Sequence, residues 1–172
     1  MTRIAESQAN WRDDHPIPLH ISFVCTGNIC RSPMGEVVFR RLVEDAGIAE
    51  QFVITSRGMG DWHVGNQADP RTLTALARRG YDGEPHRAAQ LSDADIAQHQ
   101  LLIALDRGHE QLMLDRGADP ERVVLLTEFD PEQPDDPDVF DPYWSDEDAF
   151  DRVLEQVERS CRVLLERLSG DR

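Results

Sequence analysis

A cysteine and an arginine stand at the two ends of the segment Cys25-Thr26-Gly27-Asn28-Ile29-Cys30-Arg31, and Ser32-Pro33 follows directly. Gly27 and Asn28 tolerate positive φ angles, so this loop can curl with its backbone N–H groups pointing inward. Such a nest, backed by the N-terminus of a helix, binds anions. Arg31 would close the nest with a planar guanidinium that binds two phosphate oxygens. The segment therefore predicts a phosphate-binding loop.

Cys25 would supply a nucleophile for the bound phosphate. The positive field of the loop favours the thiolate over the thiol, and a thiolate at the floor of a phosphate cradle is placed to attack phosphorus. Alternatively, Cys25 is a small buried apolar residue and Arg31 is a surface charge. The strand before the loop and the helix after it favour the chemical interpretation.

The apolar run at residues 19–24 predicts a first strand that ends at Cys25, and Ser32-Pro33 predicts the N-cap and first residue of a helix that runs to about residue 46. The same patterns predict further strands at 52–55, 101–105 and 123–126, and helices at 70–79, after Ser92, at 108–116 and at about 146–168. Strands that alternate with helices predict an α/β fold with a parallel sheet covered by helices on both faces. Ligands of such folds bind at the carboxyl ends of the strands, where Cys25 is expected.

Composition limits the class of protein. The 172 residues carry a net charge of −15, which argues against nucleic-acid binding, and no apolar run approaches the length needed to span a membrane. Residues 1–17 lack the apolar core of a signal peptide, so we expect a polar, frayed extension followed by a single domain at 18–170. Three cysteines without a zinc-site spacing fit a protein of the reducing cytoplasm, although unconventional secretion stays open.

Residues 24–33 match the whole signature V-C-x-G-N-x-C-R-S-P, and on that motif the sequence closely resembles the low-molecular-weight protein tyrosine phosphatases. The resemblance extends over residues 19–168. It implies a three-layer fold with a four-stranded parallel sheet of order 2-1-3-4, a phosphocysteine intermediate, a phosphotyrosine-containing protein as substrate, and no metal or cofactor. We expect the enzyme to be a monomer.

The resemblance also implies a general acid in an Asp-Pro-aromatic motif. Five Asp-Pro pairs occur, but only Asp141 is followed by an aromatic residue, on the long acidic loop at 127–145; Asp136 is the second choice. Protonated Asp141 would give its proton to the tyrosyl oxygen while Cys25 attacks, and ionised Asp141 would then activate water. These roles predict a bell-shaped pH profile with a mildly acidic optimum.

Other residues match supporting positions of the family. Asn28, Ser32, Ser56 and His86 would brace the loop, whose other phosphate-binding positions are Thr26, Gly27, Ile29 and Cys30. The walls of the substrate pocket would come from Ile29, Trp62, Tyr143 and Trp144. Cys30 could form a reversible disulfide with Cys25. Arg57 departs from the family, in which a small residue follows the serine; Arg57 and Arg87 are candidates for a basic pocket rim.

Three rival functions stay open. Protein arginine phosphatases resemble this chain but carry threonine at the position of Ile29. Arsenate reductases need two further downstream cysteines, whereas only Cys161 lies downstream, on the apolar face of the last helix. A catalytically silent phosphotyrosine-binding module would be expected to lose Cys25 or Asp141, and both are present.

Overall fold

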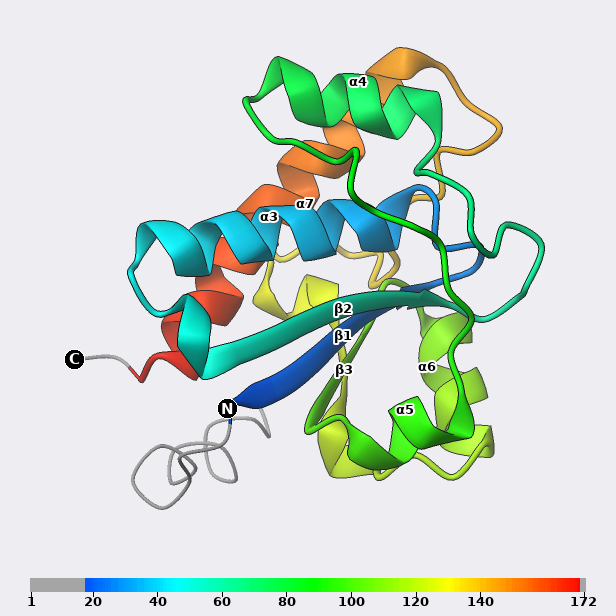
Figure 1. Ribbon diagram of the computed structural model, residues 1–172, viewed down its shortest axis with the longest axis vertical. Helices are drawn as coiled ribbons and strands as arrows, with labels where there is room; N and C mark the ends of the chain where they lie inside the picture. Colours follow the sequence, from blue (N-terminus) through cyan, green and yellow to red (C-terminus); the bar gives the residue numbers. More distant parts are fainter. Residues whose placement is uncertain (1–17, 171–172) are drawn as a thin grey trace.

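A computed structural model describes residues 18–170 of the chain (Figure 1). The predicted extension at 1–17 lies outside these residues. Four parallel strands form one sheet of order β2-β1-β3-β4, as predicted. Their bounds are Leu19–Cys25 for β1, Phe52–Gly58 for β2, Leu101–Ala104 for β3 and Val123–Leu125 for β4.

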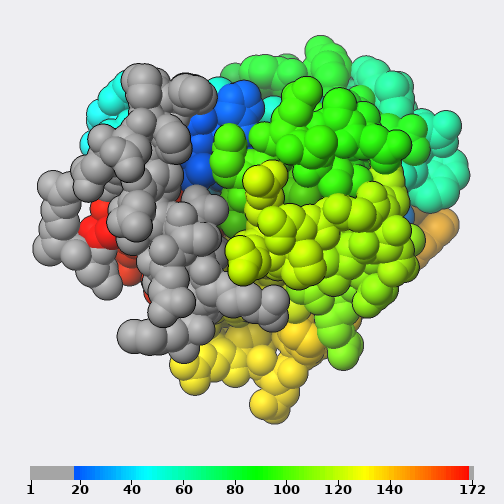
Figure 2. Space-filling model, turned by 90° about the horizontal axis from the view of Figure 1, so that it is seen from below, coloured from blue at the N-terminus to red at the C-terminus, as the bar shows by residue number. Residues whose placement is uncertain are grey.

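Helices cover both faces of the sheet, so the fold has three layers, as Figure 1 shows. One layer holds α3, α4 and α7, and the other holds α5 and α6, which appear in green to yellow on the face that Figure 2 shows from below. The helices are α3 (Arg31–Asp45), α4 (Pro70–Arg78), α5 (Asp93–Gln98), α6 (Arg107–Asp115) and α7 (Glu147–Leu168). Short 3₁₀ turns stand at η1 (Ala49–Gln51), η2 (Pro120–Arg122) and η3 (Leu126–Phe129).

The central strand β3 is apolar throughout because helices bury both of its faces. All four residues of β3 are buried, and α7 contributes a stripe of buried residues that includes Cys161. Among residues 18–170, no helix combines the length and the apolar character that a membrane span requires.

The predicted start of α3 was wrong by two residues. The helix begins at Arg31 with Cys30 at its N-cap, whereas Ser32 and Pro33 lie inside the first turn. Ser32 cannot serve as the cap because its hydroxyl is engaged in the loop before the helix. Pro33 is tolerated there because the N–H groups of the first turn have no partner within the helix. The predicted loop at 127–145 was also too long, because η3 occupies its first residues.

Candidate active site

The loop after β1 lies at the carboxyl end of the sheet, where the structure forms a cavity of about 210 Å³. Its lining includes Cys25, Arg31 and Asp141, which come from the end of β1, the start of α3 and the loop before α7. Cys25 and Arg31 are each only 3 % exposed. The fold therefore brings the three side chains proposed from the sequence into one cavity, although they are up to 116 positions apart along the chain.

Asn28 holds the curl of the loop. Its φ angle of 58° is in the left-handed region that asparagine tolerates better than most residues. The amide Nδ2 donates to Ser32 Oγ at 2.8 Å and to Ser56 Oγ at 2.9 Å, and Oδ1 accepts from the Ala89 N–H at 2.9 Å. Ser32 Oγ in turn lies 2.9 Å from Cys25 Sγ, where a hydroxyl donor would stabilise a thiolate.

Gly58 lets β2 approach the loop closely. It pairs with Cys25 in the sheet, and a Cβ at this position would lie only 3.1 Å from the carbonyl oxygen of Thr26. A side chain here would push against backbone atoms of the phosphate loop. The close approach therefore requires glycine.

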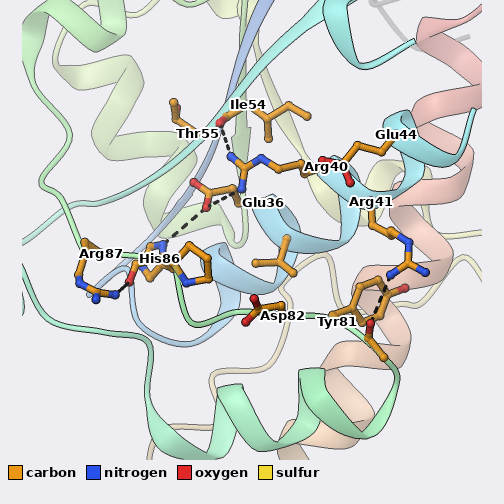
Figure 3. A pocket seen from close by; sticks show the side chains of 13 residues that line it. Glu36, Arg40, Arg41, Glu44, Ile54, Thr55, Tyr81, Asp82, His86 and Arg87 are labelled. Atoms are coloured by element: carbon orange, nitrogen blue, oxygen red, sulfur yellow. Dashed lines mark hydrogen bonds and ion pairs between the residues drawn. The ribbon is translucent and has the colours of Figure 1, made fainter. Parts of the chain in front are cut away.

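A chain of buried polar contacts supports Asn28, and Figure 3 shows three of its residues, His86, Glu36 and Arg40. His86 Nε2 lies 2.8 Å from the carbonyl oxygen of Asn28, and His86 Nδ1 lies 3.6 Å from Glu36 Oε2. Glu36 Oε1 accepts from Ser56 Oγ at 3.3 Å. Burial acts to raise the pKa of Glu36, but the hydrogen bond from His86 and the charge of Arg40 outweigh it and hold this pKa below its usual value. Glu36 is thus an ionised anchor that the sequence analysis missed.

Four groups orient the Arg31 guanidinium. Nη1 donates to Asp106 Oδ2 and to the carbonyl oxygen of Val139, both at 2.9 Å. Nη2 lies 3.5 Å from Thr26 Oγ1 and 3.5 Å from Asp141 Oδ2. A buried cation with such fixed partners is a preorganised anion ligand.

Asp106 and His109 were also missed, and they link Arg31 to the loop a second time. Asp106 is the N-cap of α6, where Oδ1 accepts from the His109 N–H at 2.9 Å. His109 Nε2 lies 2.9 Å from Thr26 Oγ1, so Arg31, Asp106, His109 and Thr26 form a closed ring of polar contacts. The position of Asp106 directly after the apolar run of β3 was the available signal, because ligand-binding residues gather at such strand ends.

His109 is held in its neutral form. Burial lowers the pKa of its imidazole to about 4, and the positive charge of Arg31 acts in the same direction. Nδ1 lies 3.2 Å from Asp106 Oδ1. A proton on Nδ1 avoids setting a nitrogen lone pair against this carboxylate. In that tautomer Nε2 accepts a hydrogen bond from the Thr26 hydroxyl.

Asp141 is the acidic group at the mouth of the cavity. Its side chain is 49 % exposed, and Oδ1 accepts from the Tyr143 N–H at 3.1 Å. The alternative candidate, Asp136, does not line the cavity; its Oδ1 accepts from the Asp138 N–H in the preceding turn. The geometry therefore favours Asp141 over Asp136 as the residue that meets a leaving group.

Aromatic side chains form the outer walls of the cavity. Trp62 and His63 come from the loop after β2, and Tyr143 and Trp144 come from the loop before α7. Tyr143 and Trp144 pack edge to face at 4.8 Å between ring centroids. Ile29 contributes an apolar side chain to the lining. All four wall residues that the sequence indicated line one cavity, and His63 is an addition to them.

Cys30 faces the same cavity but differs from Cys25 in its surroundings. Burial and the nearby Asp69 carboxylate raise the pKa of Cys30 to about 12, so it stays a thiol near neutral pH. All three cysteines are free. Within the described residues, no group of three or more His, Cys, Asp or Glu side chains is arranged to hold a metal ion.

Arg57 and Arg87, the two candidates for a basic rim, do not line the cavity at Cys25. Arg57 Nε pairs with Asp95 at 3.2 Å, and Arg57 Nη1 donates to the carbonyl oxygen of Ser56. Arg87 lines a separate cavity of about 590 Å³ beside Arg40 and Glu36 (Figure 3). That cavity is larger than the one at Cys25, but no cysteine lines it, so volume alone does not identify the active site.

Comparison with known proteins decides the family. The family described as "Low molecular weight phosphotyrosine protein phosphatase" matches residues 20–172. The chain belongs to this family. A low molecular weight protein-tyrosine-phosphatase of Streptomyces coelicolor is 47 % identical over 150 residues, which cover 84 % of this chain and 90 % of that protein.

Solved structures agree with the fold of a low molecular weight phosphatase. A protein tyrosine phosphatase from Entamoeba histolytica, with Hepes in its active site, has a TM-score of 0.83 at 28 % identity and covers 88 % of this chain and 97 % of that chain. The YwlE arginine phosphatase, with a phosphorylated active-site serine, has a TM-score of 0.79 at 28 % identity over 90 % of this chain and 98 % of that one. The same fold therefore carries two substrate classes, which the side chains of the site must distinguish.

Proposed function

We propose that this phosphatase hydrolyses phosphotyrosine in proteins with Cys25 as nucleophile, Arg31 and the loop amides as phosphate ligands, and Asp141 as general acid and base. The observation that carries the proposal is the meeting of these three side chains in one aromatic-walled cavity. Arg31 is held there by a buried set of partners before any substrate arrives.

In the first step, Cys25 Sγ attacks phosphorus while the bond from phosphorus to the tyrosyl oxygen breaks. Asp141 gives its proton to that oxygen, and tyrosine leaves as the neutral phenol. The non-bridging oxygens carry most of the charge in the transition state, and Arg31 with the backbone N–H groups of residues 26–32 stabilises them. Ser32 Oγ, 2.9 Å from Cys25 Sγ, stabilises the thiolate before attack and as it leaves later.

In the second step, Asp141 takes a proton from water, and the resulting hydroxide attacks phosphorus. The bond from phosphorus to sulfur breaks, inorganic phosphate forms, and the Cys25 thiolate is regenerated. Asp141 suits both steps because it is half exposed and therefore reaches the leaving group and then water. The first step needs Asp141 protonated and Cys25 ionised, so activity should fall on both sides of a mildly acidic optimum.

The walls favour an aryl phosphate. The nucleophile is only 3 % exposed at the floor of the cavity, and flat rings form the sides. A phenolic side chain is long enough to bring its phosphate to this floor, whereas phosphoserine is shorter. Ile29 offers no hydroxyl to a phosphoarginine guanidinium, which favours phosphotyrosine over phosphoarginine.

The proposal includes a cytoplasmic, monomeric enzyme. Three free cysteines suit a reducing compartment. The acidic net charge of −15 favours solubility as a single chain.

Phosphate release from a phosphotyrosine peptide and from a phosphoarginine protein tests the proposal, at mildly acidic pH in thiol and without metal. We expect the wild-type enzyme to turn over phosphotyrosine, Cys25→Ser to abolish turnover, and Cys161→Ser, in the core of α7, to retain it. A trapped phosphocysteine at Cys25 after acid quench would support the intermediate. Turnover of phosphoarginine alone would assign the rival activity, and binding of phosphotyrosine without turnover would assign the silent module.

A further inference from the structure

Two exposed tryptophans line the catalytic cavity. Five large apolar residues of the described chain are exposed, namely Trp62, Val64, Leu112, Phe140 and Trp144. Trp62 and Trp144 line the cavity, Val64 is next to His63 of its wall, and Phe140 is next to Asp141. Exposed apolar residues that cluster mark binding surfaces more often than single scattered ones do.

A phosphotyrosyl group cannot account for the whole of this surface. Trp144 is 90 % exposed and Trp62 is 70 % exposed, although both border a cavity of only about 210 Å³. Trp144 packs edge to face against Tyr143, with an interplanar angle of 88°. The two indoles therefore keep apolar surface outside the cavity that a phosphotyrosyl group would fill.

The charges around the mouth disfavour an acidic partner. Asp61, next to Trp62, is exposed, and Asp141 is half exposed. The guanidinium groups in the first turns of α4 and α6 are already paired: Arg71 with Asp69 at 2.9 Å, and Arg107 with Asp138 at 3.1 Å. Among the described residues that line the cavity, Arg31 is the only arginine, and it is committed to the phosphate.

We propose that the outer faces of Trp62 and Trp144, here called the indole rim, bind apolar side chains that flank phosphotyrosine in the protein substrate, and that the acidic mouth disfavours acidic flanks. The inference rests on the proposed function, and it adds the class of substrate sequence to it. An apolar side chain that covers an exposed indole removes apolar surface from water, which favours binding. Acidic flanking residues would instead be repelled by the acidic mouth, most strongly at low ionic strength.

The test compares phosphotyrosine peptides of equal length whose flanking residues are leucine, serine or aspartate. The readout is kcat/KM at low ionic strength, divided by kcat/KM for free phosphotyrosine measured with the same enzyme. We expect leucine flanks to exceed serine flanks by roughly 5- to 10-fold, because one partly covered apolar contact falls at the low end of such effects. Aspartate flanks should fall below serine flanks, and the gap should narrow as salt is added.

Trp144→Ala should lower the leucine-to-serine ratio, and the double variant Trp62→Ala/Trp144→Ala should bring it close to one. Leu112→Ala removes an exposed apolar residue of α6 outside the cavity lining and should leave that ratio unchanged. Equal rates for all flanks, a preference for aspartate, or a leucine preference that survives the double substitution Trp62→Ala/Trp144→Ala would each overturn the inference. These outcomes are distinct from failure of the proposed function, in which the wild-type enzyme would not hydrolyse free phosphotyrosine either.

Discussion

The two sides of the active site are built in opposite ways. On the phosphate side, Asn28, Arg31 and Ser32 are buried, and each makes several hydrogen bonds to groups fixed by different elements. On the leaving-group side, Asp141 is half exposed and Trp144 is almost fully exposed, and both belong to a loop. The difference follows from what each side must bind: phosphate has one shape and one charge, whereas the leaving group must exchange with water and belongs to a larger substrate.

Arg31→Lys should have the largest effect, because it changes the side chain that binds phosphate on the rigid side of the site. Lysine keeps the charge but loses the fork that holds phosphate and the contacts to Asp106 and Val139. We expect kcat/KM for a phosphotyrosine peptide to fall by about 10³- to 10⁴-fold, with the fold retained by circular dichroism. A loss below 10-fold would show that the geometry of the guanidinium is not needed.

Asp141→Asn tests the open side. Without the proton donor, kcat for a phosphotyrosine peptide should fall by about 10²- to 10³-fold. The loss should be much smaller for 4-nitrophenyl phosphate, whose leaving group needs little protonation. Asp136→Asn is the matched control, because this carboxylate does not line the cavity. A comparable loss in Asp136→Asn would reverse the assignment of the acid.

Asn28→Ala tests whether the rigidity of the phosphate side also stabilises the fold. The change leaves Ser32 Oγ, Ser56 Oγ and the Ala89 N–H without their amide partner, at a position with positive φ. Ser32 Oγ and Ser56 Oγ keep other partners, so the group left unsatisfied is the Ala89 N–H. That loss costs about 1–3 kcal/mol and alanine in the left-handed region adds about 1–2 kcal/mol, so the free energy of unfolding should fall by roughly 2–5 kcal/mol in urea denaturation. An unchanged stability would mean that the loop is held mainly by the sheet and α3.

The smallest effect concerns His109. Between pH 6.5 and about 4 the unfolded chain protonates this histidine, whereas the folded protein keeps it neutral. Its contribution to stability is therefore present above pH 6.5 and is lost as the pH falls towards 4, by at most about 3 kcal/mol. His109→Asn should flatten this part of the curve of unfolding free energy against pH. A curve with the wild-type slope would show that other groups cause the acid sensitivity.

The sequence analysis recovered the fold because its signals are local. Apolar runs, residues that start and end helices, and the alternation of strand and helix predicted the parallel sheet. The order of its strands was predicted from the family that the signature at residues 24–33 indicated. The start of α3 was wrong because the Ser-Pro pair is a typical N-cap signal, whereas Ser32 makes its hydrogen bonds within the phosphate loop. A cap preference is weak compared with several buried hydrogen bonds.

The sequence by itself determined the phosphate loop, since the nucleophile, the curl and the guanidinium lie within seven consecutive residues, 25–31. Only the tertiary structure decided what holds and surrounds that loop. Glu36, Asp106 and His109 are ordinary helix and cap residues in the sequence, and they become supports because the sheet brings the ends of β1, β2 and β3 together. Arg57 and Arg87 were candidates for the rim by type, but their side chains lie elsewhere. Charge and residue type are properties of the sequence, whereas a contact depends on the path of the chain between distant residues.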